Sequence, residues 1–251
     1  MRAHNVAVGV AVATMAIVGT SACSADSSAR PRSASQSAAT PLQGRLRDGL
    51  LTQAQLPDGF QALTEQVNAT TTGAPHARAS TVSIASMPCP ELGVGTFMTV
   101  HAPPVEDVAV GLEQVPDGDG DSDGDGYGDD EGWFGQESLD RYAPGRAAAV
   151  MDAIRGAAQR CPSYTDTFVT GTHGQSTVSV TGADVQADDS LVLRITTTMP
   201  EVTDPFISET AFVREGDVIL MVQKVVGQKP RSGVEAVLPA AVAAYRTAAA
   251  G

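Results

Sequence analysis

The segment Val218-Ile-Leu-Met-Val222 is the sequence feature that most constrains the fold. Its five consecutive apolar residues leave no polar face, so a strand built from them must be buried on both faces, inside a sheet. The turn sequence Glu215-Gly216-Asp217 precedes it, and the segment Ile207 to Val213 precedes that turn. The two segments and the turn form a β-hairpin pattern. The sequence therefore predicts a sheet in which Val218 to Val226 is a central strand and 207–213 is its partner.

The spacing of apolar residues predicts the remaining elements. Apolar residues at every second position indicate four more strands; these lie around Phe97–His101, Val108–Leu112, Val178–Val180 and Leu191–Ile195. Helical spacing is found at Leu46, Leu50 and Leu51, at Ala147, Val150, Met151, Ile154 and Ala158 between Pro144 and Cys161-Pro162, and near Pro239 to Ala249. This order predicts an α+β fold, with an antiparallel β-sheet and helices packed on one face, in a single domain.

The charge of the chain excludes some classes of partner. Its 251 residues carry a formal net charge of −13, and eight of the acidic residues lie between Asp117 and Glu131. No basic cluster is present that could neutralise phosphates, which argues against nucleic-acid binding and against electrostatic docking on anionic lipid.

The first 22 residues have the pattern of a bacterial signal peptide. A short basic start precedes the apolar segment Val6 to Val18, which is too short to span a bilayer comfortably. Gly19-Thr-Ser-Ala-Cys23 then resembles a lipobox, so we expect a lipid anchor on Cys23 at the extracytoplasmic face of the cell membrane. Ordinary cleavage and release, or retention as an anchor, is the alternative. Residues 23–43 are expected to be the lipidated cysteine and a flexible tether, and residues 44–251 the folded domain.

Two further cysteines, Cys89 and Cys161, are expected to form a disulfide. An exported protein meets an oxidising compartment, where paired cysteines become bonded. The alternative is two buried free thiols. A zinc site is not expected, because no histidine pair accompanies these cysteines at zinc-binding spacing.

The acidic segment 117–131 can be aligned on an EF-hand calcium loop. Alternating carboxylates around Gly124 are the oxygen ligands that calcium prefers; the candidate metal ligands are Asp119, Asp121, Asp123, Asp125 and Asp130. The match weakens at Gly126, where an apolar residue is expected, and at Asp130, where glutamate is usual. A solvated acidic loop insertion without a cofactor is therefore the preferred interpretation, and calcium binding is the alternative.

No residue pattern predicts catalysis. Ser122 lies in a Gly-x-Ser-x-Gly match, but aspartates flank it and neither a strand nor a helix adjoins it, so a nucleophilic role is not expected. The histidines of the domain are too dispersed for a metal pair: we expect His76 and His173 in surface loops and His101, partly buried, at a strand end. Trp133, Phe134 and Tyr142 are expected to pack under the helix that follows, rather than to form a binding platform.

Several segments, in their order along the chain, resemble the PknH-like extracellular sensor domain, which occurs on mycobacterial serine/threonine kinases and as free-standing actinobacterial lipoproteins. They are Leu50-Leu51, Leu56-Pro-Asp-Gly-Phe60, Met87-Pro-Cys-Pro90, Ala147–Arg160 with Cys161-Pro162, and Phe212–Val218. The resemblance spans about residues 45–250. It implies an antiparallel sheet with helices on one side and a cleft, and a role in binding or sensing a ligand outside the cell. The kinase-linked members have a second disulfide, for which this chain lacks the cysteines.

The sequence thus favours a membrane-anchored, non-enzymatic ligand-binding or sensor-like domain. Its partners would be the membrane, through the lipid anchor, and an unidentified small-molecule, cell-wall or protein ligand. One alternative is a calcium-dependent surface or adhesion module that uses the 117–131 loop. Another is a secreted hydrolase, which would need catalytic groups assembled by the fold from distant positions.

Overall fold

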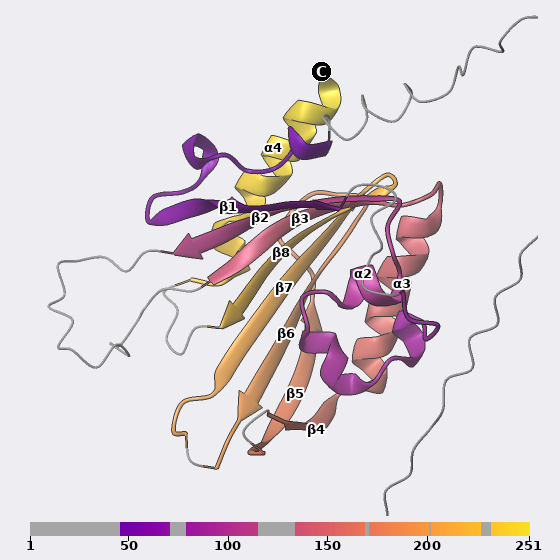
Figure 1. Cartoon of the computed structure of the whole chain (residues 1–251), viewed down its shortest axis with the longest axis vertical. Coiled ribbons are helices and arrows are strands. Elements are labelled where there is room, and N and C mark those ends of the chain that lie inside the picture. The colour runs from indigo at the N-terminus through magenta and orange to yellow at the C-terminus, as the bar shows by residue number, and fades with distance from the viewer. Residues whose placement is uncertain (1–45, 71–78, 115–133, 169–170, 201, 227–231) are drawn as a thin grey trace, which may run out of the picture. The chain divides into compact units, whose positions relative to one another are not determined.

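A computed structural model describes residues 46–70, 79–114, 134–168, 171–200, 202–226 and 232–251 (Figure 1). Cys23 and the acidic segment 117–131, with its candidate calcium ligands and Ser122, lie outside these residues, as do His76 and Trp133. In the part that is described, no helix combines the length and the apolar character that a membrane span requires.

Eight strands form an antiparallel sheet in the order β1-β2-β3-β8-β7-β6-β5-β4 (Figure 1). In chain order the strands are β1 (Phe60–Thr70), β2 (Glu106–Gln114), β3 (Phe134–Arg141), β4 (Ser163–Thr167), β5 (His173–Thr181), β6 (Asp189–Thr198), β7 (Phe206–Glu215) and β8 (Val218–Val226). Three α-helices, α2 (Phe97–His101), α3 (Arg146–Arg160) and α4 (Leu238–Ala250), accompany them in the described residues. Short 3₁₀ turns are η1 (Gln53–Gln55), η2 (Ile84–Ser86), η3 (Cys89–Gly93) and η4 (Val234–Ala236). The predicted antiparallel α+β class and single domain are confirmed.

The predicted central strand is confirmed in β8, which lies between β3 and β7. All five side chains from Val218 to Val222 are at most 5% exposed. Gly216 adopts a φ of +60° in the β7–β8 turn, a conformation that glycine enters without steric cost. The next residue, Asp217, accepts a hydrogen bond from the backbone N–H of Gly145 at 2.8 Å, and so joins the hairpin to the start of α3.

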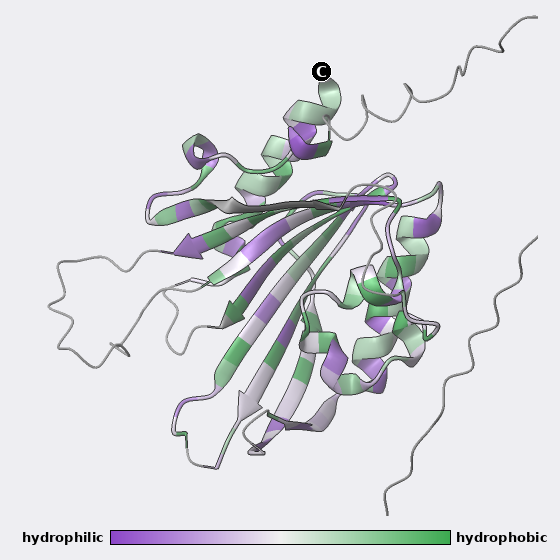
Figure 2. Cartoon of the chain, in the orientation of Figure 1, coloured by the Kyte–Doolittle hydropathy of each residue, from purple (hydrophilic) through white to green (hydrophobic). Residues whose placement is uncertain are grey.

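The two faces of the sheet carry different helices. On β8, Ile219 and Met221 belong to the core that contains α2 and α3, whereas Val218, Leu220 and Val222 belong to the core that contains α4. Neighbouring residues of a strand point to opposite faces, so α3 and α4 lie on opposite sides. The prediction that the helices pack on one face therefore holds for α2 and α3 but is wrong for α4, which packs on the other face. The physical reason is β8 itself, because a strand that is apolar on both faces needs cover on both (Figures 1 and 2).

The prediction of a strand at Phe97–His101 is wrong, because these residues form α2. Phe97, Met98 and His101 are buried, and Thr99 and Val100 are only partly buried. This is the spacing of one helical face rather than of a strand. Ala102 N–H donates to the carbonyl of Met98 at 2.8 Å and closes the turn. Over five residues, apolar periodicity does not separate the two structures.

The aromatic residues before α3 have two different environments. Tyr142 is 3% exposed and packs in the same core as α3, as expected. Phe134, which begins β3, is 59% exposed, so its predicted packing under the helix is wrong. Its position at the end of a strand carries the ring beyond the part of the sheet that α3 covers.

Candidate ligand-binding pocket

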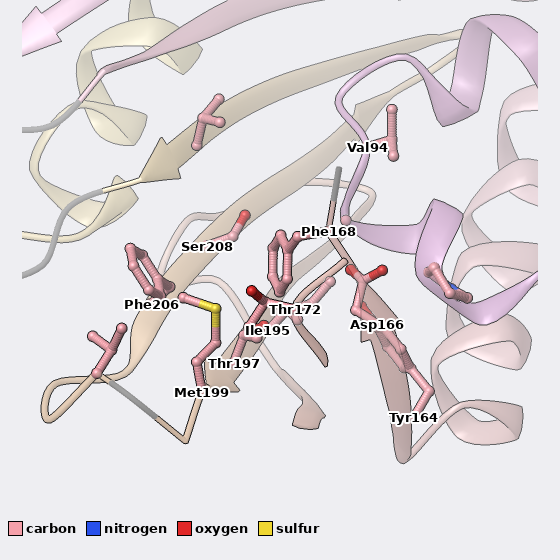
Figure 3. Close-up of a pocket in the computed structure, with 14 residues that line it drawn as sticks. Val94, Tyr164, Asp166, Phe168, Thr172, Ile195, Thr197, Met199, Phe206 and Ser208 are labelled. Atoms are coloured by element: carbon pink, nitrogen blue, oxygen red, sulfur yellow. The ribbon is translucent and has the colours of Figure 1, made fainter. Parts of the chain in front are cut away.

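A cavity of about 590 Å³ lies on the face of the sheet that carries α3. It is at the end of the sheet where β4, β6 and β8 finish and β5 and β7 begin. Its volume lies within the range of small-molecule sites. The lining residues are Pro90, Gly93, Val94, Tyr164, Asp166, Phe168, Thr172, Ile195, Thr197, Met199, Val202, Phe206, Ser208 and Val225 (Figure 3).

Strand register explains how residues far apart in the sequence form the floor of the pocket. Ile195 pairs with Ser208, and Thr197 pairs with Phe206, so alternate residues of β6 and β7 share one face. On β4, Tyr164 and Asp166 are also alternate residues, and Phe168 follows just beyond the strand. Figure 3 shows side chains from β4, β6 and β7 grouped around one space.

The opposite wall of the pocket is η3, and it lies very close to the sheet. A Cβ atom on Gly93 would be 3.4 Å from the Cδ1 atom of Ile195 and 3.9 Å from the hydroxyl oxygen of Tyr164. Any side chain longer than a methyl group at this position would therefore push η3 away from the floor or fill the pocket.

The disulfide between Cys89 and Cys161, which the sequence predicts, is confirmed. It joins the first residue of η3 to the residue that follows α3, with 5.6 Å between their Cα atoms. Because β4 begins at Ser163, the bond links the two walls that carry Gly93 and Tyr164.

Two polar side chains hold the segment around η3 as well. The guanidinium of Arg160 donates to the carbonyl oxygens of Met87 at 2.6 Å and Ala85 at 3.1 Å. The ring of His101 is hydrogen-bonded at both nitrogens, to the carbonyl of Val82 at 2.7 Å and to Glu91 Oε2 at 2.5 Å. The buried His101 thus fixes η3 rather than lying free in a cleft, whereas His173 is exposed.

Several hydroxyl groups in the pocket already have protein partners. Thr197 is hydrogen-bonded to Ser176 at 2.8 Å, and Ser208 donates to the carbonyl of Lys224 at 3.2 Å. Burial raises the pKa of Tyr164, the hydrogen bond with Ser176 opposes that rise, and the negative charge of Asp166 adds to it. These groups support the walls and leave a mainly apolar interior.

Asp166 is the one charged residue among the described residues that line the pocket. Its Oδ1 atom accepts the backbone N–H of Thr167 at 2.8 Å. The pocket mouth is apolar, because Val94, Phe168 and Val225 are each more than one-third exposed. The pocket therefore presents apolar side chains to the solvent around a single described carboxylate.

Two deeply buried carboxyl groups lie outside the pocket, on β3. Burial raises the pKa of Glu137 to about 7, against the hydrogen bond that its Oε2 accepts from Leu51 N–H at 2.8 Å. Burial, together with the negative charge of Asp107 on the neighbouring strand, raises the pKa of Asp140 to about 8. These groups belong to the interior of the sheet and do not line the pocket.

The candidate metal and lipidation residues remain predictions. Cys23 and the aspartates at 119, 121, 123, 125 and 130 lie outside the described residues. Within the described residues, no three or more histidine, cysteine, aspartate or glutamate side chains come together to form a possible metal site. The resemblance implied a cleft, but none of the residues that line the pocket was predicted as a site residue; the alternating Tyr164, Asp166 and Phe168 were the one signal for its β4 wall.

Comparisons with solved structures give a distant structural likeness. No protein-family model matches the chain, and no curated protein matches it. The crystal structure of the extracellular domain of PknH from Mycobacterium tuberculosis is similar with a TM-score of 0.49 and 12% sequence identity, covering 83% of this chain and 97% of that one. Such a likeness assigns no ligand, partner or residue role to this chain.

Proposed function

We propose that this chain is a non-enzymatic, extracytoplasmic ligand-binding domain, held at the cell membrane by a lipid on Cys23. The observation that carries the proposal is the apolar cavity of about 590 Å³, with its two walls joined by the Cys89–Cys161 disulfide. A largely preformed apolar pocket with few polar groups is typical of small-molecule sites. The disulfide supports export, because such bonds persist in oxidising compartments.

The chemistry of the lining supports binding rather than catalysis. Among the described residues of the lining, the titratable side chains are Tyr164 and Asp166. The raised pKa of Tyr164 keeps the phenol protonated at neutral pH, so it is a poor base. The hydroxyls of Thr197 and Ser208 are hydrogen-bonded to Ser176 and to a backbone carbonyl, and neither arrangement supplies the base that a nucleophilic hydroxyl requires.

Binding of Nile red, an uncharged apolar dye, tests the pocket. The full chain carrying Cys23→Ala, with its disulfide formed, is expected to bind the dye and increase its fluorescence. Ser208→Trp places an indole in the cavity and should weaken binding at least tenfold. The matched control is Val180→Trp, at a residue 39% exposed that does not line the pocket, and it should bind like the parent. Equal binding by all three proteins, with unchanged melting temperatures, would overturn the assignment of the pocket.

Anchoring is tested separately in cells. The wild-type protein is expected in the membrane fraction with a diacylglyceryl group on Cys23, since that cysteine is the predicted lipid acceptor. Cys23→Ala should move the protein into the medium or leave it unprocessed. The lipid anchor would be contradicted if the wild-type mature protein were found in the soluble fraction and mass spectrometry showed Cys23 to be unmodified. That result would leave the ligand-binding proposal unaffected.

A further inference from the structure

The position of Asp166 in the pocket determines which ligand chemistry can be accommodated. Asp166 lies on β4 between Tyr164 and Phe168, at alternate positions of the chain. In the described residues, the hydrogen bond from Thr167 N–H occupies Oδ1, and Oδ2 has no hydrogen-bond donor. Among the described residues that line the pocket, there is no lysine, arginine or histidine to neutralise the carboxylate.

The surroundings of Asp166 place an aromatic ring beside it. Its cross-strand neighbour on β5 is Gly174, which has no side chain. A Cβ atom on Gly174 would be 2.9 Å from the Cε2 atom of Phe168 and 2.8 Å from the Cγ2 atom of Thr197. The absence of a Cβ atom therefore lets the Phe168 ring lie against the backbone of β5, next to Asp166 (Figure 3).

A carboxylate with aromatic neighbours attracts positive charge in two ways. The carboxylate provides a Coulombic attraction that is stronger in an apolar environment than in water. The faces of aromatic rings add a cation–π attraction. An anionic ligand would meet repulsion at the same place, and the net charge of −13 would also repel it from the protein as a whole.

The rest of the pocket fits an apolar body. From β4 to β8 the pocket crosses four strand spacings, which is about 19 Å. Along this path the floor presents Ile195, Met199 and Phe206, and Val225 lies at the far end from Asp166. The polar end of the pocket is therefore on β4, and its apolar end is on β7 and β8.

We propose that the pocket binds a small amphiphilic amine, with its single positive charge against Asp166 and its apolar body across β6 and β7. This proposal rests on the pocket being a ligand site, and it adds the chemical class of the ligand. The cavity holds a small molecule rather than a folded partner, because its volume of about 590 Å³ is that of small-molecule sites.

Displacement of Nile red by three amphiphiles with the same alkyl chain tests this proposal. Decylamine, decanol and decanoate differ in their head groups, which are positive, neutral and negative at neutral pH. With the full chain carrying Cys23→Ala, decylamine should displace the dye at a concentration at least tenfold lower than decanol, and decanoate should be the weakest. Added salt should reduce the difference between decylamine and decanol, because ions screen the attraction.

Matched variants identify the charge responsible. Asp166→Asn should remove the preference for decylamine and leave displacement by decanol unchanged. Asp152→Asn removes the same charge from α3, where the side chain is 82% exposed and outside the pocket, and should keep the preference. Equal displacement by decylamine and decanol in the parent, or a preference that survives Asp166→Asn, would overturn the amine proposal but not pocket binding. If Nile red itself does not bind, both proposals fail.

Discussion

Removal of the Cys89–Cys161 disulfide is expected to lower the free energy of unfolding by about 4 kcal/mol. The bond closes a loop with a sequence separation of 72 residues, and the chain-entropy model gives this magnitude for a loop of that length. The suitable variant is Cys89→Ala with Cys161→Ala, because a single replacement would leave an unpaired thiol that can form disulfides between molecules. Urea unfolding, with the midpoint and slope fitted together, measures the change.

The same variant is expected to bind Nile red more weakly, because η3 loses its covalent link to the start of β4. A control separates this effect from general destabilisation. Met151→Ala opens a cavity under α3, at a fully buried residue away from the pocket lining, and should cost about 2–5 kcal/mol. Under folding conditions it should retain dye binding. An unchanged urea midpoint in the double cysteine variant would contradict the stabilising role of the bond.

Stability is expected to fall as the pH rises from about 5 to 9. Glu137 and Asp140 have pKa values raised to about 7 and about 8, so the folded protein holds protons that the unfolded chain releases near pH 4. The stability that this difference in proton binding provides is fully present below the unfolded pKa, near 4. It is lost as the pH rises through the folded pKa of each carboxyl group. The rise in the pKa of Glu137 alone corresponds to a change of roughly 3 kcal/mol in the free energy of unfolding across this pH range.

Other carboxyl groups make the folded protein less stable at low pH. Burial would raise the pKa of Glu209, but hydrogen bonds from Lys224 and Arg194 hold it below the ordinary value. A hydrogen bond from Arg155 lowers the pKa of Asp189. The stabilisation from these two groups is present above their unfolded pKa and is lost as the pH falls through the folded one. Maximum stability is therefore expected near pH 5.

Melting temperatures across this pH range test the assignment. Asp140→Asn and Glu137→Gln should each flatten the fall, and each variant should melt above the wild type at pH 9. Asp152→Asn, which replaces an exposed aspartate, should keep the wild-type profile. A wild-type melting temperature that is constant between pH 5 and 9, or a slope that persists when both buried acids are replaced, would show that these carboxyls are not the cause.

The sequence predicts those parts of the fold whose burial follows a simple apolar pattern. In β2, β6 and β8 and in α3, the buried residues are mostly apolar and evenly spaced, so periodicity finds these elements. Strand β3 escapes prediction because it buries Glu137, Ser138 and Asp140, and polar residues normally indicate exposure. Strand β4 was not predicted because it has only five residues, and its alternate side chains are only partly buried.

The residues that line the pocket could not be predicted, for a different reason. Pro90 and Val225, at its two extremes in the chain, are brought to one cavity by strand order and by the disulfide. Period-two patterns give the face of a residue but not the neighbouring strand, and a short segment such as η3 gives no periodic signal. The disulfide was predictable because it depends on the compartment and the number of cysteines.

The location of Leu46 bears on how the domain is presented to its surroundings. Leu46, the first described residue, packs in the core beneath α4, whereas the pocket belongs to the opposite face of the sheet. The first described residue therefore lies on one side of the sheet and the proposed ligand pocket on the other. Under the proposed function, attachment and capture would use separate surfaces, so a domain held through its N-terminal segment would exchange molecules with the surrounding medium without first detaching or turning over.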